Sequence, residues 1–128
     1  MKHGLDALEV VKRLEAGFAL KVGLAGSRSE AAYHFSVYRT AIGTFRGSLK
    51  NIQGHELGSV VIKESIKKSN LKLNDVDELI IGQVLTGATG QNPARQAAIL
   101  AGLPIEKTAY VINQVCGSGL RSVAAGYQ

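Results

Sequence analysis

Val111-Ile-Asn-Gln-Val-Cys-Gly-Ser-Gly-Leu-Arg121 joins a strand pattern to a helix pattern and holds the only cysteine of the chain, Cys116. The β-branched and aromatic run at 108–113 predicts a buried strand. Residues 117–127, with four apolar side chains and Arg121 as the only charged one, predict a largely buried helix. At such a junction the sulfur lies by the first turn of a helix, where backbone N–H groups and the macrodipole favour an anion. The thiolate is the nucleophilic form of cysteine, so the pattern indicates a reactive sulfur.

The alternative is that Cys116 is a small core hydrophobe, which is the usual state of a single cysteine in an apolar setting. The flanking residues favour the reactive interpretation. Gly117 and Gly119 leave room for a ligand or a second backbone to approach, although each costs about 1 kcal/mol relative to alanine in a helix. Ser118 adds a hydroxyl group between them.

Three motifs in this chain are similar to the N-terminal part of the thiolases. They are Asn-Gln-Val-Cys-Gly-Ser-Gly-Leu at 113–120, Gly-Gln-Asn-Pro-Ala-Arg-Gln-Ala at 90–97, and Arg-Thr-Ala-Ile-Gly-Thr-Phe at 39–45. The thiolases comprise acetyl-CoA acetyltransferases and 3-ketoacyl-CoA thiolases. The resemblance runs from about Phe35 to Gln128, with the motifs in the family's order and at compatible spacing.

The resemblance implies that Cys116 is the catalytic nucleophile of an acyltransferase. It would carry an acyl group as a thioester between acyl-CoA and acetyl-CoA or CoA, in Claisen condensation or in thiolytic cleavage of a 3-ketoacyl-CoA. Coenzyme A thioesters are substrates here, and no further cofactor and no metal are expected. The family also implies a homodimer or tetramer of the full-length protein, in which Gln91, Asn92 and Arg95 bridge subunits near the active site. A single cysteine suits a reducing compartment, so we expect a cytoplasmic location.

The rest of the family's catalytic machinery is missing from these residues. The chain contains no Gly-His-Pro motif and no second cysteine in a Cys-x-Gly motif, and His3, His34 and His55 stand in other contexts. His55 is expected to be a solvated surface residue. We therefore expect a fragment that ends within the nucleophile's helix and has little turnover alone. The alternative is a catalytically incomplete association module that retains the dimerisation surface.

Composition excludes several other classes of protein. The 128 residues are 45% hydrophobic with a net charge of +5, but the basic residues are dispersed and no apolar run is long enough to span a bilayer. Neither a nucleic acid nor a membrane is therefore expected as a partner. The acidic cluster Asp75, Asp77 and Glu78 lacks further ligands at usable spacing, so it predicts a solvated loop and not a metal site.

The order of patterns predicts an α/β fold with a mainly parallel sheet and crossover helices. By resemblance this is the first part of the layered αβαβα thiolase fold. Residues 1–31 form an atypical N-terminal extension without a family counterpart, and residues 32–128 form a partial thiolase N-terminal domain truncated within the nucleophile helix. The predicted elements are a helix at 5–14, a strand at 33–38, a helix at 55–69, a strand at 79–85, a helix beginning at Pro93 and ended by Gly102, and the junction at 108–127.

Overall fold

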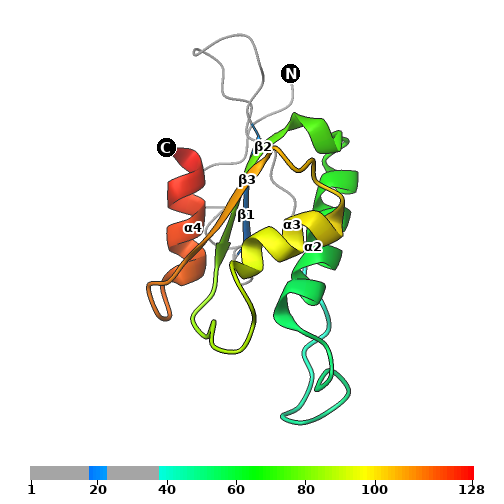
Figure 1. Ribbon diagram of the computed structural model, residues 1–128, viewed down its shortest axis with the longest axis vertical. Helices are drawn as coiled ribbons and strands as arrows, with labels where there is room; N and C mark the ends of the chain where they lie inside the picture. Colours follow the sequence, from blue (N-terminus) through cyan, green and yellow to red (C-terminus); the bar gives the residue numbers. More distant parts are fainter. Residues whose placement is uncertain (1–17, 23–37) are drawn as a thin grey trace.

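The structure, a computed structural model, describes residues 18–22 and 38–128. Its elements follow the chain in the order shown in Figure 1. They are β1 (Phe18–Val22), α2 (Gly54–Lys68), the single turn of 3₁₀-helix η1 (Leu73–Asp75), β2 (Val76–Gly82), α3 (Pro93–Ala101), β3 (Thr108–Ile112) and α4 (Ser118–Tyr127).

The three strands form one sheet in the order β1-β2-β3. Strands β2 and β3 are parallel, with Glu78 opposite Thr108, and α3 lies on the connection between them. This unit confirms the α/β class and the parallel crossover. Strand β1 pairs antiparallel with β2, with an irregularity in register at its end. No strand was expected in this stretch, which belongs to the predicted N-terminal extension.

Two predicted elements lie wholly or mostly outside the described residues. They are the helix at 5–14 and the first strand at 33–38. Of these only Tyr38 is described, and it is not in a strand.

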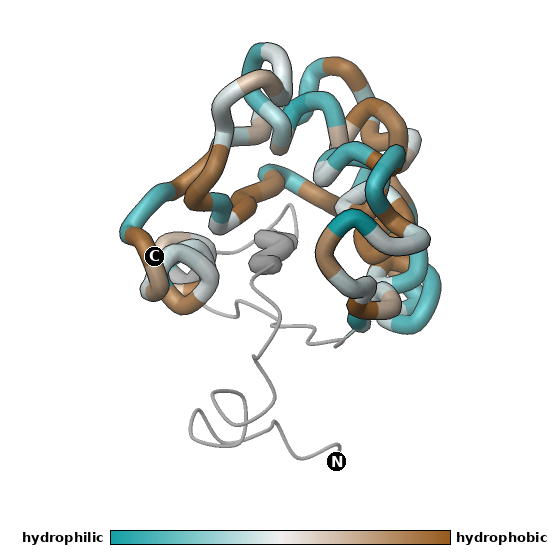
Figure 2. Tube along the Cα trace, turned by 90° about the horizontal axis from the view of Figure 1, so that it is seen from below, coloured by the Kyte–Doolittle hydropathy of each residue, from teal (hydrophilic) through white to brown (hydrophobic). Residues whose placement is uncertain are grey.

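Helices cover both faces of the sheet. Helix α4 packs on one face against β2 and β1, whereas α3 packs on the other face and α2 packs on α3. The view from below shows the same separation, with the helix at the C terminus apart from the other two (Figure 2). The hydrophobic core lies between β2, α2 and α3 and is built from Ile62, Ile66, Val76, Leu79, Ile81, Ala94, Ala97, Ala98, Ala101 and Leu103.

Local signals explain where α2 and α3 begin and end. The backbone N–H of Gln53 donates to the Glu56 carboxylate at 2.6 Å, which satisfies one donor at the start of α2. Asn92 caps α3 by accepting a hydrogen bond from the Arg95 N–H at 3.1 Å. Gly102 ends α3 with a φ of 89°, a conformation that glycine adopts without steric cost. The predicted helix boundaries are therefore confirmed to within one residue.

The junction elements are less buried than expected. Strand β3 is at the edge of the described sheet, and its Tyr110 is 37% exposed. In α4, Ser118 and Ser122 are buried, whereas Leu120 is 57% exposed. The prediction of a buried strand and a largely buried helix was wrong on this point, because α4 presents its small residues to the sheet.

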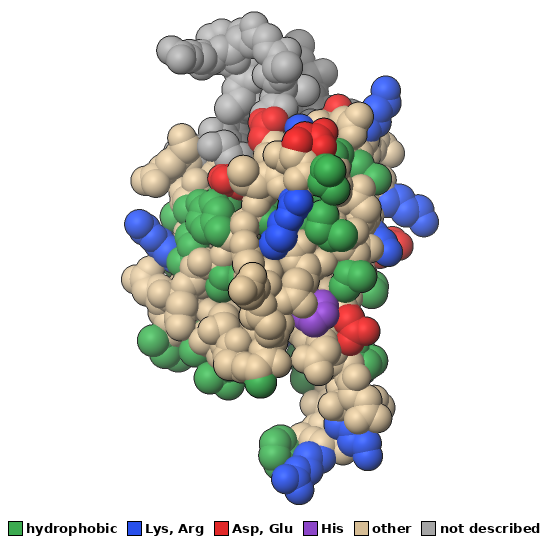
Figure 3. Space-filling model, in the orientation of Figure 1, with side chains coloured by type: hydrophobic (Ala, Val, Ile, Leu, Met, Phe, Trp, Pro, Cys, Tyr) green, Lys and Arg blue, Asp and Glu red, His purple; other side chains and the backbone are tan. Residues whose placement is uncertain are grey.

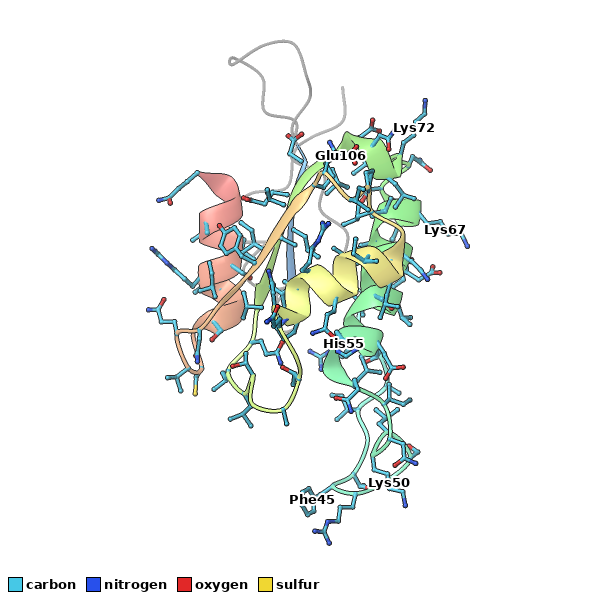
Figure 4. The ribbon with its side chains drawn as sticks, in the orientation of Figure 1. Phe45, Lys50, His55, Lys67, Lys72 and Glu106 are labelled. Atoms are coloured by element: carbon cyan, nitrogen blue, oxygen red, sulfur yellow. The ribbon has the colours of Figure 1, made fainter. Side chains whose placement is uncertain are left out.

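The segment before α2 projects from the body of the molecule (Figure 3). Phe45 lies at its end, 92% exposed, with the Arg46 guanidinium 5.5 Å from the centre of its ring (Figure 4). Hydrophobic side chains on this projection are exposed to water, and this exposure is unfavourable in proportion to the exposed apolar area. None of the helices in residues 38–128 is long and apolar enough to cross a bilayer.

Two leucines test where the core lies. Leu79 is 1% exposed, and Leu85 is 83% exposed. We expect Leu79→Ala to lower the free energy of unfolding by about 2–5 kcal/mol, or to abolish cooperative unfolding, because it opens a cavity. Leu85→Ala should change it by less than about 0.5 kcal/mol. Urea unfolding followed by circular dichroism measures both, and equal losses would contradict the assigned core.

Candidate active site at the β3–α4 junction

The candidate site lies at the carboxyl end of the parallel pair of strands. Because β2 and β3 are parallel, the loops that follow them, 83–92 and 113–117, emerge at the same edge of the sheet (Figure 1). The Gln83 N–H donates to the Ile112 carbonyl at 3.1 Å, which continues the ladder past β2. The Asn113 side chain then donates to the Val84 carbonyl at 3.1 Å. These bonds fasten the two loops together.

A strained turn precedes α4. Val115 has a φ of 48°, in the left-handed region that a β-branched residue rarely adopts. Such a conformation costs on the order of 1–3 kcal/mol and persists only where the surroundings enforce it. The Val115 N–H donates to the Asn113 side chain at 3.0 Å, and the Gly117 N–H donates to the Gln114 carbonyl at 2.9 Å.

Ser118, the first residue of α4, bonds back to this turn. Its hydroxyl accepts a hydrogen bond from the Gln114 N–H at 2.9 Å and donates one to the Val115 carbonyl at 2.7 Å. The residue is 4% exposed, so these bonds are largely shielded from water. The serine between the two glycines thus holds the backbone on the N-terminal side of the cysteine.

Gly82 brings the start of α4 against the end of β2. A Cβ atom at Gly82 would lie 2.5 Å from the carbonyl carbon and oxygen of Ser118, a distance that no real side chain tolerates. The sequence pattern does not indicate this role. By contrast, a Cβ at Gly117 would meet the Gln114 carbonyl oxygen at 3.3 Å, so Gly117 serves the turn itself.

Cys116 is a free, exposed thiol in this turn, two residues before the first residue of α4. No side chain caps the N-terminus of α4, where Gly117 occupies the cap position. A helix start without a capping side chain leaves backbone N–H groups for an anion or for solvent. The predicted position of the cysteine between strand and helix is confirmed, and its exposure is inconsistent with a core-packing role in this chain.

The one described histidine is not beside the cysteine. His55 is in α2, on the face of the sheet opposite α4 (Figures 1 and 4). It is half-buried, and its Nδ1 atom is shielded from solvent without a hydrogen-bond partner. The expectation of a solvated surface histidine was therefore only partly right. His3 and His34 lie outside the described residues.

The Gly90–Ala97 motif is engaged within its own chain. The Asn92 side chain donates to the Ala109 carbonyl at 2.8 Å. Arg95 donates to the carbonyls of Ile105 and Lys107 at 2.6 and 2.7 Å. These contacts tie α3 to the strand that leads into the cysteine turn, a role that the sequence did not indicate for Arg95.

The acidic residues at 75–78 do not converge on one point, and two of them bind separate neighbours. The Asp75 carboxylate accepts from the Lys72 N–H at 2.9 Å, and Glu78 accepts from the Thr108 hydroxyl at 2.8 Å. Within the part of the chain that the structure describes, no group of three or more histidine, cysteine or acidic side chains comes together as a metal site would require.

Comparison with known proteins places the junction in a family. The model of the thiolase N-terminal domain matches residues 35–128, which include the cysteine turn and α4. The chain belongs to the thiolase family. Acetyl-CoA acetyltransferases from Rhizobium meliloti and Paracoccus denitrificans are each 55% identical to it over 93 residues, or 73% of this chain and 24% of theirs.

A solved thiolase has a similar fold. The crystal structure of the Acat5 thiolase from Ascaris suum in complex with coenzyme A matches with a TM-score of 0.66 at 39% identity. The match covers 68% of this chain and 23% of that one. The chain therefore spans about a quarter of the length of the relatives it matches, and the thiolase fold predicted from its motifs is confirmed.

Two glycines test the contact between β2 and α4. We expect Gly82→Ala to lower the free energy of unfolding by about 1–3 kcal/mol, because the new methyl group must push backbone atoms of Ser118 aside. Gly87→Ala is the control, since a Cβ there meets nothing within 4 Å. It should be neutral or stabilise by up to about 1 kcal/mol. Urea midpoints compare the two, and an unaffected Gly82→Ala protein would show that α4 does not abut β2.

Proposed function

We propose that this chain carries the nucleophile of a thiolase and that Cys116 is the acyl-accepting residue. The Cys116 thiolate attacks the carbonyl carbon of an acyl-CoA, the bond from that carbon to the CoA sulfur breaks, and CoA leaves as a thiolate that takes up a proton. The acyl group stays on Sγ as a thioester. Exchange between two thioesters of similar energy divides the overall reaction into two easier steps.

The second half-reaction forms a carbon–carbon bond. A base removes a proton from the α-carbon of acetyl-CoA, the carbanion attacks the Cys116 thioester, and the sulfur leaves as the regenerated thiolate. The product is a 3-ketoacyl-CoA, and the reverse sequence with free CoA is thiolytic cleavage.

The observation that carries the proposal is an exposed thiol in a constrained turn at an uncapped helix start, within the segment matched by the thiolase domain. Relatives named acetyl-CoA acetyltransferases and a similar thiolase solved with coenzyme A support CoA thioesters as the substrate class. We propose that the protein needs no cofactor beyond those substrates. We also propose a cytoplasmic location, in keeping with its single cysteine, and assembly of the full-length form as a homodimer or tetramer.

We expect the 128 residues alone to complete the first half-reaction at most. The second needs an acid–base group, and these residues contain neither a second cysteine nor a Gly-His-Pro sequence. We also expect stabilisation of the oxyanion to be incomplete, and the loss of one donor costs about 100-fold or more in rate.

Acyl transfer to the thiol is measured directly by mass spectrometry. Incubation of the chain with acetyl-CoA should leave one acetyl group on the peptide that contains Cys116, removable by hydroxylamine as a thioester is. Cys116→Ala should lose the adduct, and any acetyl group that persists in that variant would mark lysine acylation instead. Absence of a hydroxylamine-sensitive adduct on the folded protein would contradict the proposal.

A second candidate function is that of an association module. It is favoured by the projecting segment, where Phe45 and Ile42 are 92% and 78% exposed. Hydrophobic side chains in such a position are typical of surfaces that another polypeptide covers.

Co-expression separates the two functions. A polypeptide with the Gly-His-Pro and Cys-x-Gly motifs of a relative should restore thiolysis of acetoacetyl-CoA when combined with this chain. Cys116→Ala should abolish that activity while the two polypeptides still co-purify. Full activity of the Cys116→Ala complex would leave only the association role.

A further inference from the structure

Three buried serines in the described part of the chain each make the same type of local hydrogen bond. Ser59, Ser118 and Ser122 are 7%, 4% and 0% exposed, and each hydroxyl donates to the carbonyl three residues earlier at 2.7 Å. This is an ordinary way for a helical serine to satisfy its donor. A bond of this kind alone assigns no function to any of them.

Ser118 differs in using its acceptor as well. Its hydroxyl oxygen accepts a hydrogen bond from the Gln114 N–H at 2.9 Å. Within residues 38–128, the hydroxyls of Ser59 and Ser122 act as donors only. The two bonds of Ser118 span the turn from Gln114 to Val115, directly before Cys116. A hydroxyl is the smallest side-chain group that donates and accepts at once.

The strained residue is the one that Ser118 holds. Val115 has its carbonyl bonded to the Ser118 hydroxyl at 2.7 Å and to the Ser118 N–H at 3.1 Å. Its φ of 48° is unfavourable for valine without such restraint. The position of Ser118 is itself restrained, because its backbone packs against Gly82 at the end of β2.

We propose that Ser118 is a positioning residue that holds the Val115 turn, and with it the Cys116 sulfur, at the start of α4. The inference rests on the proposed function, since it concerns the orientation of that nucleophile. Ser118 acts through the backbone and not on the substrate. Neither the cysteine motif nor the family's acid–base residues require this role.

The single cysteine makes the test specific. The rate of alkylation of Cys116 by iodoacetamide is measured for the native chain and in concentrated guanidinium chloride, and the ratio of the two rates is compared between variants. We expect Ser118→Ala to lower the ratio at least about five-fold, because it removes two hydrogen bonds and one bond of ordinary net strength already corresponds to that factor. Ser122→Ala, the matched buried serine of the same helix, should leave the ratio unchanged.

Val115→Gly provides a rescue. Glycine adopts a positive φ without steric cost, so the turn no longer depends on the serine. The double variant Val115→Gly/Ser118→Ala should therefore react within about two-fold of Val115→Gly, a non-additive effect that a general packing role would not produce. Equal effects of Ser118→Ala and Ser122→Ala, or a double variant as slow as Ser118→Ala, would overturn the inference.

Amide hydrogen exchange separates this inference from the proposed function. Ser118→Ala should accelerate exchange of the Gln114 N–H, the donor to the lost hydroxyl, and leave β2 protected. Accelerated exchange there in a protein whose wild-type thiol gains no acetyl group would reject Cys116 as the nucleophile and retain Ser118 as the residue that holds the turn. Unchanged exchange at Gln114, or loss of protection throughout the sheet, would overturn the positioning role itself.

Discussion

The close approach of Gly82 to the first turn of α4 is the constraint on which the candidate site depends. Gly82 is the last residue of β2, pairs with Ile112 at the end of β3, and leaves no room for a Cβ beside Ser118. Strands β2 and β3 and the start of α4 are therefore all in contact at Gly82. Because the helix start is pressed against the end of the central strand, the short connection from β3 to α4 must reverse within a few residues, and it does so through a strained turn that carries the cysteine.

Much of this architecture follows from local sequence. Asn92 before Pro93 and Gly102 after the helix define α3 because capping acts over one turn of chain. The apolar run at 79–85 predicts a strand buried on both faces, and β2 is such a strand but lies three residues earlier, at Val76–Gly82. The place of Cys116 between strand and helix follows from the same kind of local change in pattern.

The remaining features depend on contacts between distant residues. Gly82 meets Ser118 thirty-six positions later, and no periodicity signals such a partner. The apolar and small residues of 117–127 predicted a largely buried helix, but Leu120 is 57% exposed, whereas Ser118 and Ser122 are buried. Strand β1 and the left-handed Val115 likewise have no short-range signal, since pairing partners and enforced strain arise from tertiary structure.

The turn before Cys116 is held in a conformation that valine does not favour. Strain at Val115 costs on the order of 1–3 kcal/mol. The hydrogen bonds of Ser118 and Asn113 with this turn, at about 0.5–1.5 kcal/mol each, are of the same order and oppose that strain. An unfavourable backbone conformation is thus held by specific contacts directly before Cys116, whose thiol is exposed.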